Sequence, residues 1–301
     1  MPPARSILDR IAHLRVDRAR ANPAPHKPLL LLVVLELAEK GELPNRLLPL
    51  SPELAFRFAT YWTVVAHRRT QKPDVRFPFF HIGSEGFWRP LDAAGQLAID
   101  ERFARVAELD PQFAEFARDS SLREQARRVL IAKYFEPAER IALYTLVGMP
   151  VPTEDEIAAD AGFEPTDSAK GKGRDMRFRL DVVAAYNYTC ALTGSRLTTI
   201  TAGSIVDAAH IHQFSDSRND DPRNGMALCK NAHWLFDAGL WSLDDDYRVL
   251  VANERFVEES PNQKPLIDYQ GERLRLPSDE RIWPDPKHIA WHRKKHSFDA
   301  A

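Results

Sequence analysis

The sequence predicts an α+β protein of two domains. Residues 1–150 should be mainly helical with one short β-hairpin, and residues 174–301 should mix strands with helices. Three observations support this. A chain of 301 residues has the length of two ordinary domains. Segments with helical periodicity fill most of the first half. Residues 151–173 are acidic, contain prolines and end rich in glycine and lysine, which is typical of a linker.

The composition is that of a globular protein, since 44% of the residues are hydrophobic and 28% are charged. The formal net charge of −2 excludes binding of nucleic acid through bulk basicity, so such binding would need local basic patches. Two cysteines, Cys190 and Cys229, exclude a four-cysteine zinc site. The N-terminus lacks a secretory pattern, and the longest apolar run, Leu29 to Leu35, is too short to span a bilayer. We therefore expect a cytoplasmic protein without a membrane segment.

Two helices are predicted near the N-terminus. Residues 5–20 place apolar side chains on one helical face and five arginines, Arg20 among them, on the rest. This pattern is typical of a solvated amphipathic helix, and a phosphate-facing edge is the alternative. The run from Leu29 to Ala38 is nearly all apolar, so this helix should be buried on most sides, and Gly41 marks its end. His26 and Lys27 lie at its positive end, where cations are unfavourable unless an anion binds, so a ligand site and a structural role both stay open.

The rest of the first half contains further helices and one predicted hairpin. Residues 52–69 predict a helix with a large aromatic face. Residues 72–91 hold two short β-like runs around a Gly-Ser-Glu-Gly turn, which predicts a β-hairpin. Pro78 excludes a regular central strand there, so the aromatic run around it forms an apolar surface as readily as a ladder. Three more helices are predicted between residues 109 and 146, two of them starting at an acidic residue followed by proline.

Three motifs occur in order along the first half: APHKPLLLL, a Tyr-Trp pair in the next helix, and a PFF…GFW segment. Together they resemble the sulfur-binding domains of McrA-like, modification-dependent restriction nucleases. In that family an apolar dent, built partly from a Tyr-Pro step, receives the sulfur of a phosphorothioate, and basic residues hold neighbouring phosphates. Here the step is Phe77-Pro78, and His81 stands where a smaller or apolar residue is usual. The DNA-contacting residues that the resemblance implies are Arg20, His26, Lys27, Arg76, Phe77, Pro78 and His81.

The second domain is predicted as helix, strand, long loop and helix. The segment that begins at Arg174 places apolar side chains on one helical face, and a later β-like stretch leads into His210. A polar, turn-rich loop follows and ends at Asn224-Gly225. Residues 226–238 have helical character, and Gly239 marks the end of that helix.

Four polar residues of this region have the chemistry of a metal-assisted hydrolytic site. His210 ends the strand, and an imidazole can take a proton from water near neutral pH. His233 and Asp237 are four residues apart on one predicted helix, so both project from one face and can hold one cation. Asn224 ends the loop, where an amide can fix the backbone that carries the base. A single histidine is more often structural, but these four residues at these spacings indicate a site.

The motifs CALTG, DAAHI, RNGMAL and HWLFDAGLW resemble those of the HNH, or ββα-metal, endonucleases, over residues 174–296. The resemblance implies a catalytic set of a general base, a loop-ordering amide, a metal-binding histidine and its second ligand: His210, Asn224, His233 and Asp237. Many members have a metal ligand directly before the base, where this sequence has Ala209. Strand alternation puts Asp207 on the same side as Ala209, so we expect Asp207 to replace that ligand.

The two resemblances together imply a metal-dependent DNA endonuclease, with a DNA-reading domain followed by a ββα-metal nuclease domain. The first domain would recognise phosphorothioated double-stranded DNA, and the second would cut it. The expected metal is Mg²⁺ or Mn²⁺, which suit oxygen ligands, or Ni²⁺ or Zn²⁺, which suit histidine. A homodimer or successive nicks would cut both strands. Two alternatives stay open: a first domain that reads a methylated base or a protein partner, and a catalytically silent DNA-binding regulator.

Overall fold

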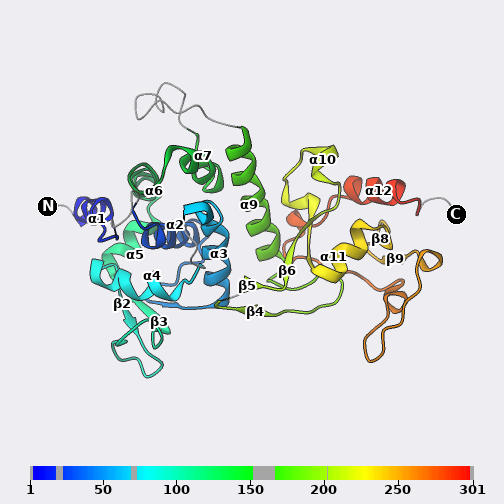
Figure 1. Cartoon of the computed structure of the whole chain (residues 1–301), viewed down its shortest axis with the longest axis horizontal. Coiled ribbons are helices and arrows are strands. Elements are labelled where there is room, and N and C mark those ends of the chain that lie inside the picture. Colours follow the sequence, from blue (N-terminus) through cyan, green and yellow to red (C-terminus); the bar gives the residue numbers. More distant parts are fainter. Residues whose placement is uncertain (1–2, 18–22, 69–72, 152–166, 202, 299–301) are drawn as a thin grey trace. The chain divides into compact units, whose positions relative to one another are not determined.

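The parts of the chain that the computed structural model describes are residues 3–17, 23–68, 73–151, 167–201 and 203–298. The chain divides into two compact units (Figure 1). Unit 1 comprises Met1–Arg177 and Thr199–Gly203, and unit 2 comprises Phe178–Thr198 and Ser204–Ala301. The predicted α+β class is confirmed, since helices and short antiparallel strands both occur. Among the described residues, no helix has the length and apolar character that crossing a membrane requires.

Unit 1 is built from helices around a buried central one. Its helices are α1 (Pro3–Ala12), α2 (His26–Glu39), α3 (Pro52–Trp62), α4 (Arg76–His81), α5 (Pro111–Arg118), α6 (Ser120–Tyr134), α7 (Pro137–Leu146) and the first part of α9 (Asp167–Ala185). The central helix, α2, contacts α3, α4, α5 and α6. Every residue from Pro28 to Ala38 is buried, as its apolar sequence predicts. The one charged residue in this run, Glu36, is compensated by Arg57 and Lys40, each with a nitrogen 3.0 Å from Oε1.

The two helix starts predicted at Asp110-Pro111 and Glu136-Pro137 are confirmed, but two predicted helix ends in unit 1 are wrong. Asp110 caps α5 by accepting a hydrogen bond from the backbone N–H of Phe113 at 2.9 Å, and Glu136 precedes α7 in a capping box. By contrast, α1 ends at Ala12 and α3 ends at Trp62, short of the predicted bounds. Helix ends depend on tertiary packing more than on local signals, which explains the difference.

A three-stranded antiparallel sheet completes unit 1, in the order β1 (Leu47–Pro49), β3 (Val106–Leu109), β2 (Trp88–Leu91). The hairpin predicted for residues 72–91 is wrong, because the RFPFFH run forms α4 and β2 pairs with β3 instead. The spacing of the buried residues explains this: they recur at i, i+3, i+4 and i+7, the helical pattern, at Val75, Pro78, Phe79 and Ile82. Pro78 is the third residue of α4, where a missing N–H costs no helical hydrogen bond.

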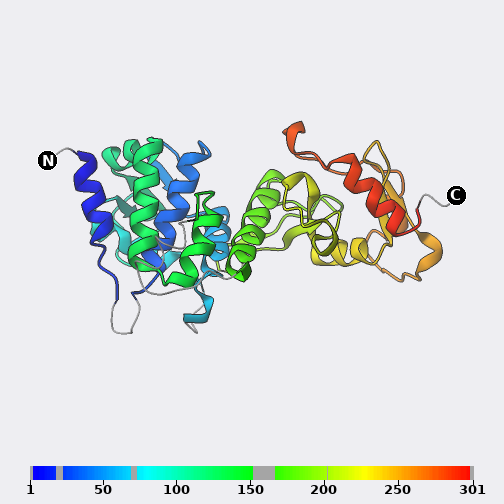
Figure 2. The same cartoon turned by 90° about the horizontal axis from the view of Figure 1, so that it is seen from above.

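Unit 2 combines the second part of α9 with short strand pairs and three helices. Its remaining elements are β6 (Val206–His210), α10 (Phe214–Ser217), β7 (Gly225–Cys229), α11 (Lys230–Asp237), β8 (Trp241–Leu243), β9 (Val249–Val251) and α12 (Pro286–Lys295). Two-residue strands β4 (Thr198–Thr199) and β5 (Gly203–Ser204) form a sheet of their own. The C-terminal helix α12, red in Figures 1 and 2, lies beside β8.

The helix predicted from residue 226 begins later in the structure. Residues 225–229 form β7, which pairs antiparallel with β6 so that His210 lies opposite Gly225. The MAL run of β7 is buried on both faces, so it lacks the alternation that identifies a strand in sequence. Helix α11 begins at Lys230 and ends at Asp237, and Gly239 follows it with a φ of 67°. The order is therefore strand, loop, strand and helix.

The expected linker, residues 151–173, is only partly described. Residues 152–166 lie outside the described residues, and residues 167–173 are the beginning of α9, which continues to Ala185. Gly173 of this helix packs closely on α7, since a Cβ there would lie 2.5 Å from the carbonyl oxygen of Ala142. The sequence predicts that Gly173 belongs to a linker. In the structure, its missing side chain permits close packing of α9 on α7.

Candidate functional sites

His210 ends β6, and its ring is held on two sides. Phe178 of α9 stacks on it, with ring centroids 3.9 Å apart and an interplanar angle of 11°. Gly225 leaves the space for this stack, because a Cβ there would lie 2.7 Å from Cζ of Phe178. Nε2 of His210 is 3.1 Å from Oδ1 of Asp220. The side chain is 18% exposed, so solvent reaches an imidazole that packing holds in place.

Asn224 is fully buried at the end of the loop between β6 and β7. Its Nδ2 donates to the carbonyl oxygens of His212 at 2.9 Å and Asn219 at 3.0 Å. Its Oδ1 accepts the backbone N–H of His212 at 2.8 Å. One amide therefore ties the beginning of the loop to its end, which is the geometry that a loop-ordering residue requires.

His233 and Asp237 lie one turn apart on α11, with Nε2 and Oδ2 3.3 Å apart. Their side chains are 30% and 48% exposed. Two adjacent and accessible donors of this kind can bind one divalent cation. The nitrogen and oxygen donors are of the kind that hold a metal ion, and the role of this pair as metal ligands stays a prediction.

The structure gives Asp207, the predicted replacement ligand, a different partner. Its Oδ1 lies 2.7 Å from Nε of Arg179, and it also accepts the backbone N–H of Ala208 at 3.0 Å. The carboxylate is thus already neutralised by a cation. Within the described ranges, no group of three mutually close metal-type side chains includes Asp207, His233 or Asp237. Asp207 could join a metal site only after Arg179 releases it, so its role stays a prediction.

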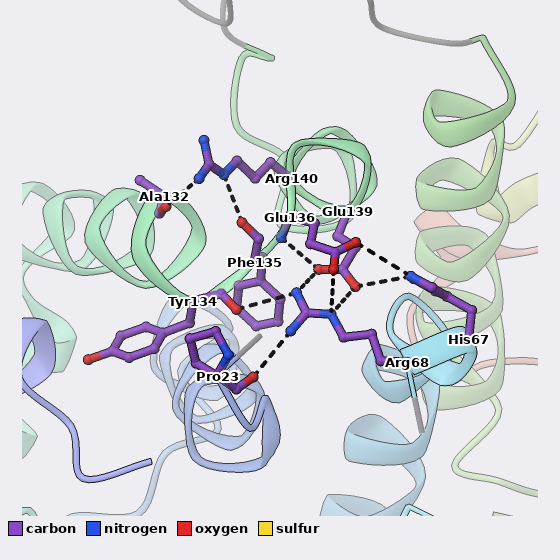
Figure 3. A network of polar contacts seen from close by, with 9 residues as sticks. All are labelled: Pro23, His67, Arg68, Ala132, Tyr134, Phe135, Glu136, Glu139 and Arg140. Carbon is purple, nitrogen blue, oxygen red and sulfur yellow. Dashed lines mark hydrogen bonds and ion pairs between the residues drawn. The ribbon is translucent and has the colours of Figure 1, made fainter. Parts of the chain in front are cut away.

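Unit 1 contains the one such group found among the described residues: His67, Glu136 and Glu139, whose ligand atoms lie within 4.8 Å of one another. Figure 3 shows Arg68 beside this group, with its guanidinium directed at the glutamate carboxylates. The Arg68 guanidinium binds both carboxylate oxygens of Glu139, and Oε2 of Glu139 also accepts the backbone N–H of Glu136 at 2.8 Å. Because an arginine already neutralises the carboxylate, the geometry is that of a structural network and not of a metal site.

A cavity of about 200 Å³ in unit 1 gathers most of the residues predicted to contact DNA. Its lining comprises His26, Lys27, Phe77, Pro78 and His81, together with Arg15, Val16, Asp17 and Ala24. Three of the lining residues carry rings that lie close together: the ring of Phe77 lies 4.4 Å from that of His81 and 6.0 Å from that of His26. Trp62 packs on His26 from α3, with centroids 4.5 Å apart. The start of α2 and both ends of α4 therefore bring two separate sequence motifs to one cavity.

Two of the predicted DNA contacts are paired with acidic side chains. Lys27 forms an ion pair with Glu85, and both side chains are largely buried, so the protein itself compensates this cation at the start of α2. Arg76 does not line the cavity; its Nη2 lies 2.6 Å from Oδ2 of Asp74, and this hydrogen bond lowers the pKa of the Asp74 carboxyl. Arg20 lies outside the described residues.

Sequence reasoning missed three residues beside these sites: Asp220 and Phe178, which contact His210, and Glu85, which pairs with Lys27. Of these three, only Glu85 had a signal in the sequence. Lys27 is a cation at the start of a buried helix, and such a cation needs a carboxylate from elsewhere in the chain. No local spacing brings Asp220 to His210, since the conformation of the loop decides that contact.

Comparison with known protein families assigns both regions. Residues 190–244 match the model of the HNH endonucleases, and residues 4–151 match that of the ScoMcrA-like DNA sulfur-binding domains. The chain carries a DNA sulfur-binding domain followed by an HNH endonuclease domain. The aromatic cavity thus belongs to the sulfur-binding domain, and His210, Asn224, His233 and Asp237 belong to the HNH domain. HNH nucleases generally use a divalent metal.

Two solved structures are similar to parts of the chain. One is the modification-dependent TagI restriction endonuclease, with 22% identity and a TM-score of 0.30 over 40% of this chain and 37% of that structure. The other is the sulfur-binding domain of SprMcrA complexed with phosphorothioated DNA, with 18% identity and a TM-score of 0.37 over 48% of this chain and 94% of that domain. The chain thus spans 37% of the TagI structure. A comparison with curated proteins found no match.

Proposed function

We propose that this protein is a divalent-metal-dependent endonuclease that recognises phosphorothioated double-stranded DNA through unit 1 and hydrolyses phosphodiester bonds through unit 2. The observation that carries the proposal is the arrangement of the β6–β7–α11 motif. It combines a solvent-accessible histidine held by packing, a buried asparagine that orders the loop, and an accessible His-Asp pair.

In the proposed reaction, His210 takes a proton from a water molecule, and the resulting hydroxide attacks phosphorus in line with the leaving oxygen. His233 and Asp237 would hold the divalent cation, which supplies electrostatic stabilisation of the charge that develops on the phosphate. The carboxylate of Asp237 favours Mg²⁺ or Mn²⁺, and the imidazole of His233 also suits Ni²⁺ or Zn²⁺. Asn224 keeps the loop in the conformation that surrounds the base.

The aromatic cavity would read the sulfur. Sulfur is larger, more polarizable and less strongly hydrated than the phosphate oxygen it replaces, so a cavity with an apolar part in its wall favours it over oxygen. Phe77 and Pro78 supply the apolar part of that wall, and His26 and His81 supply its imidazoles. Because Lys27 is paired with Glu85, affinity for neighbouring phosphates would rest on other cations, of which Arg15 lines the cavity.

The proposal also includes the setting of the reaction. A nuclease that cuts modified DNA inside the cell would act in restriction, in the cytoplasm. A homodimer would present two HNH domains, one for each strand, and cleavage by a monomer would proceed by successive nicks.

The decisive experiment uses two duplexes of one sequence, one of them with a single phosphorothioate, incubated with the protein and Mn²⁺ or Mg²⁺. We expect the modified duplex to be cut about 10-fold faster or more, which corresponds to a modest difference in binding energy. His210→Ala should slow cleavage by about 10²–10⁴-fold, the usual contribution of a general base. His13→Ala, a change of an exposed histidine outside both sites, should cut like the wild type.

Two outcomes would contradict the proposal. Equal cleavage by the wild type and His210→Ala would exclude His210 as the base. Equal cleavage of the two duplexes would mean that unit 1 reads another feature, such as a methylated base, or binds a protein.

A further inference from the structure

The loop between β6 and β7 brings an acidic side chain back to His210. Asp220 follows it by 10 residues, and Oδ1 of Asp220 lies 3.1 Å from Nε2 of the imidazole. The side chains of Asp220 and His210 are 17% and 18% exposed, so the contact between them is partly shielded from solvent. An ionised carboxylate only accepts hydrogen bonds, so the proton of this bond belongs to Nε2. When the ring is neutral, Nδ1 is then the nitrogen without a proton.

Stacking and hydrogen bonding restrict different motions of this ring. The nearly parallel ring of Phe178 fixes the plane of the imidazole. An imidazole rotated by 180° about its Cβ–Cγ bond would stack on Phe178 equally well. The stack alone therefore does not choose between these two orientations of the ring. The bond to Asp220 forms only when Nε2 faces the loop. Asp220 therefore selects both the orientation and the tautomer of His210.

The backbone on either side of Asp220 is itself held in place. Nδ2 of Asn224 donates to the carbonyl oxygen of Asn219 at 3.0 Å. The backbone N–H of Asp221 donates to Oδ1 of Asn219 at 2.9 Å, so the amide nitrogen of Asn219 points the other way. That nitrogen lies 3.2 Å from Nε2 of His288, a buried residue of α12. The position of Asp220 is thus set by the loop and by the C-terminal helix.

The C-terminal helix contacts the beginning of the same loop as well. The ring of His212 stacks on Trp291 of α12, with centroids 3.9 Å apart and an interplanar angle of 20°. Lys295 donates to the side chain of Gln213. Helix α12 lies outside residues 190–244, the span that matches the HNH model, yet it supports both ends of the loop that carries Asp220.

We infer that Asp220 is a positioning residue for His210, and this inference rests on the proposed nuclease function. Asp220 holds the proton on Nε2 and leaves Nδ1 to take the proton of the attacking water. The imidazolium formed in that step carries its charge beside the Asp220 carboxylate, which stabilises it. The proton later passes from Nδ1 to solvent, and Asp220 remains unprotonated throughout.

The kinetic test compares Asp220→Ala and Asp220→Asn with Asp216→Asn. Asp216 is an exposed acid of the same loop that contacts Ser215 and Lys295, so it is a matched control. With saturating DNA and metal, Asp220→Ala should lower kcat by about 10–100-fold, the usual effect of losing a residue that orients another. The KM of Asp220→Ala should stay within twofold of the wild-type value. Asp220→Asn should retain part of the wild-type rate, because its amide oxygen still accepts the hydrogen bond from Nε2. Asp216→Asn should keep the wild-type rate.

A second measurement does not depend on cleavage. Nitrogen NMR of the full chain with labelled histidines, under mildly alkaline conditions, should show His210 as the Nε2–H tautomer in the wild type and as a mixture in Asp220→Ala. An unchanged tautomer, or a kcat of Asp220→Ala that equals or exceeds the wild type, would overturn the inference. A lost rate that returns with more metal would also overturn it, because Asp220 would then be a metal ligand. If the wild type does not cut DNA, the nuclease proposal fails. The NMR comparison of the His210 tautomer in the wild type and in Asp220→Ala would still show whether Asp220 positions the ring.

Discussion

Glu139 carries a carboxylate that is 1% exposed, and its partner Arg68 is 5% exposed. Replacing Glu139 by glutamine keeps the shape of the side chain but leaves a buried guanidinium without its main counter-charge. Breaking a buried ion pair in this way costs about 3–5 kcal/mol. We expect Glu139→Gln to lower the free energy of unfolding of unit 1 by about 3 kcal/mol, the lower end of that range, because Glu136 lies 4.0 Å from Arg68 Nε and compensates in part. Urea unfolding followed by circular dichroism measures this change.

A matched control is available on α6. Glu124 pairs with Arg128 at 2.9 Å, but both side chains are about half exposed. Such surface pairs contribute about 0.5 kcal/mol or less, so Glu124→Gln should unfold nearly like the wild type. If Glu139→Gln and Glu124→Gln lowered the free energy of unfolding equally, burial would not explain the contribution of the Arg68–Glu139 pair to stability.

Single residues also show what the sequence can and cannot predict about the sites. His233 and Asp237 were predictable as neighbours because the period of a helix fixes their separation. The loop between β6 and β7 contains Asp216, Asp220 and Asp221, and nothing in their spacing shows that Asp220 meets His210. Contacts that helix geometry dictates can be read from sequence, whereas contacts that a loop conformation dictates cannot.

At the scale of elements, α12 brings buried histidines against the core of unit 2. His292 stacks on Phe236 with centroids 3.7 Å apart, and its Nδ1 lies 2.9 Å from Oγ of Ser242. Burial lowers the pKa of His292 to about 3, and burial also lowers the pKa of His288. Below the ordinary histidine pKa of 6.5, the unfolded chain takes up a proton that the folded chain does not, so acid favours unfolding.

We therefore expect unit 2 to be fully stable above pH 6.5 and to lose stability progressively toward pH 3. Between about pH 7.5 and about pH 5, one such histidine accounts for about 2 kcal/mol of that loss. His292→Gln cannot take up the proton, so its urea midpoint, followed by tryptophan fluorescence, should fall less over this range than that of the wild type. His13→Gln, the exposed control, should fall like the wild type. An undiminished pH dependence in His292→Gln would assign the effect to other groups.

The elements that the sequence predicted wrongly are short apolar runs. RFPFFH reads as strand-like because it is aromatic, yet it folds as α4 because its buried residues follow helical spacing. MALC reads as the start of a helix, yet it forms β7 because both of its faces are covered. Periodicity does not separate helix from strand in runs this short, and tertiary contacts decide. Long runs with clear starts, such as α2 and α5, were predictable.

At the scale of the whole molecule, two sets of motifs that lie far apart in the sequence predict two units. The composition of the chain does not predict the residue at which the two units divide. Arg177 donates to the carbonyl oxygen of Leu146 at 3.3 Å in unit 1, whereas the next residue, Phe178, stacks on His210 in unit 2. Consecutive residues of one helix thus belong to different units. Side-chain contacts place this division, so a change in composition along the chain cannot locate it.

Because the aromatic cavity and the HNH residues lie in different units, recognition and cleavage should be separable by mutation. Phe77 is 49% exposed and lines the cavity, and its ring contacts the rings of His26 and His81. Phe77→Ala should therefore lower the ratio of affinities for the phosphorothioated and unmodified duplexes by about 10-fold, the effect of losing a small apolar contact. His210→Ala should leave that ratio unchanged. Fluorescence anisotropy measures it, at one fixed salt concentration because phosphate contacts make affinity salt-dependent.

Phe103 provides the matched control for this last prediction. It is 48% exposed, belongs to the same unit and does not line the cavity, so Phe103→Ala removes an equally accessible ring from elsewhere. We expect it to keep the wild-type ratio. An equal loss in both variants would mean that the change acts on unit 1 as a whole. If Phe77→Ala kept the wild-type ratio of affinities for the two duplexes, the sulfur contact would lie outside the cavity. If His210→Ala lowered this ratio, the HNH domain would take part in choosing the DNA.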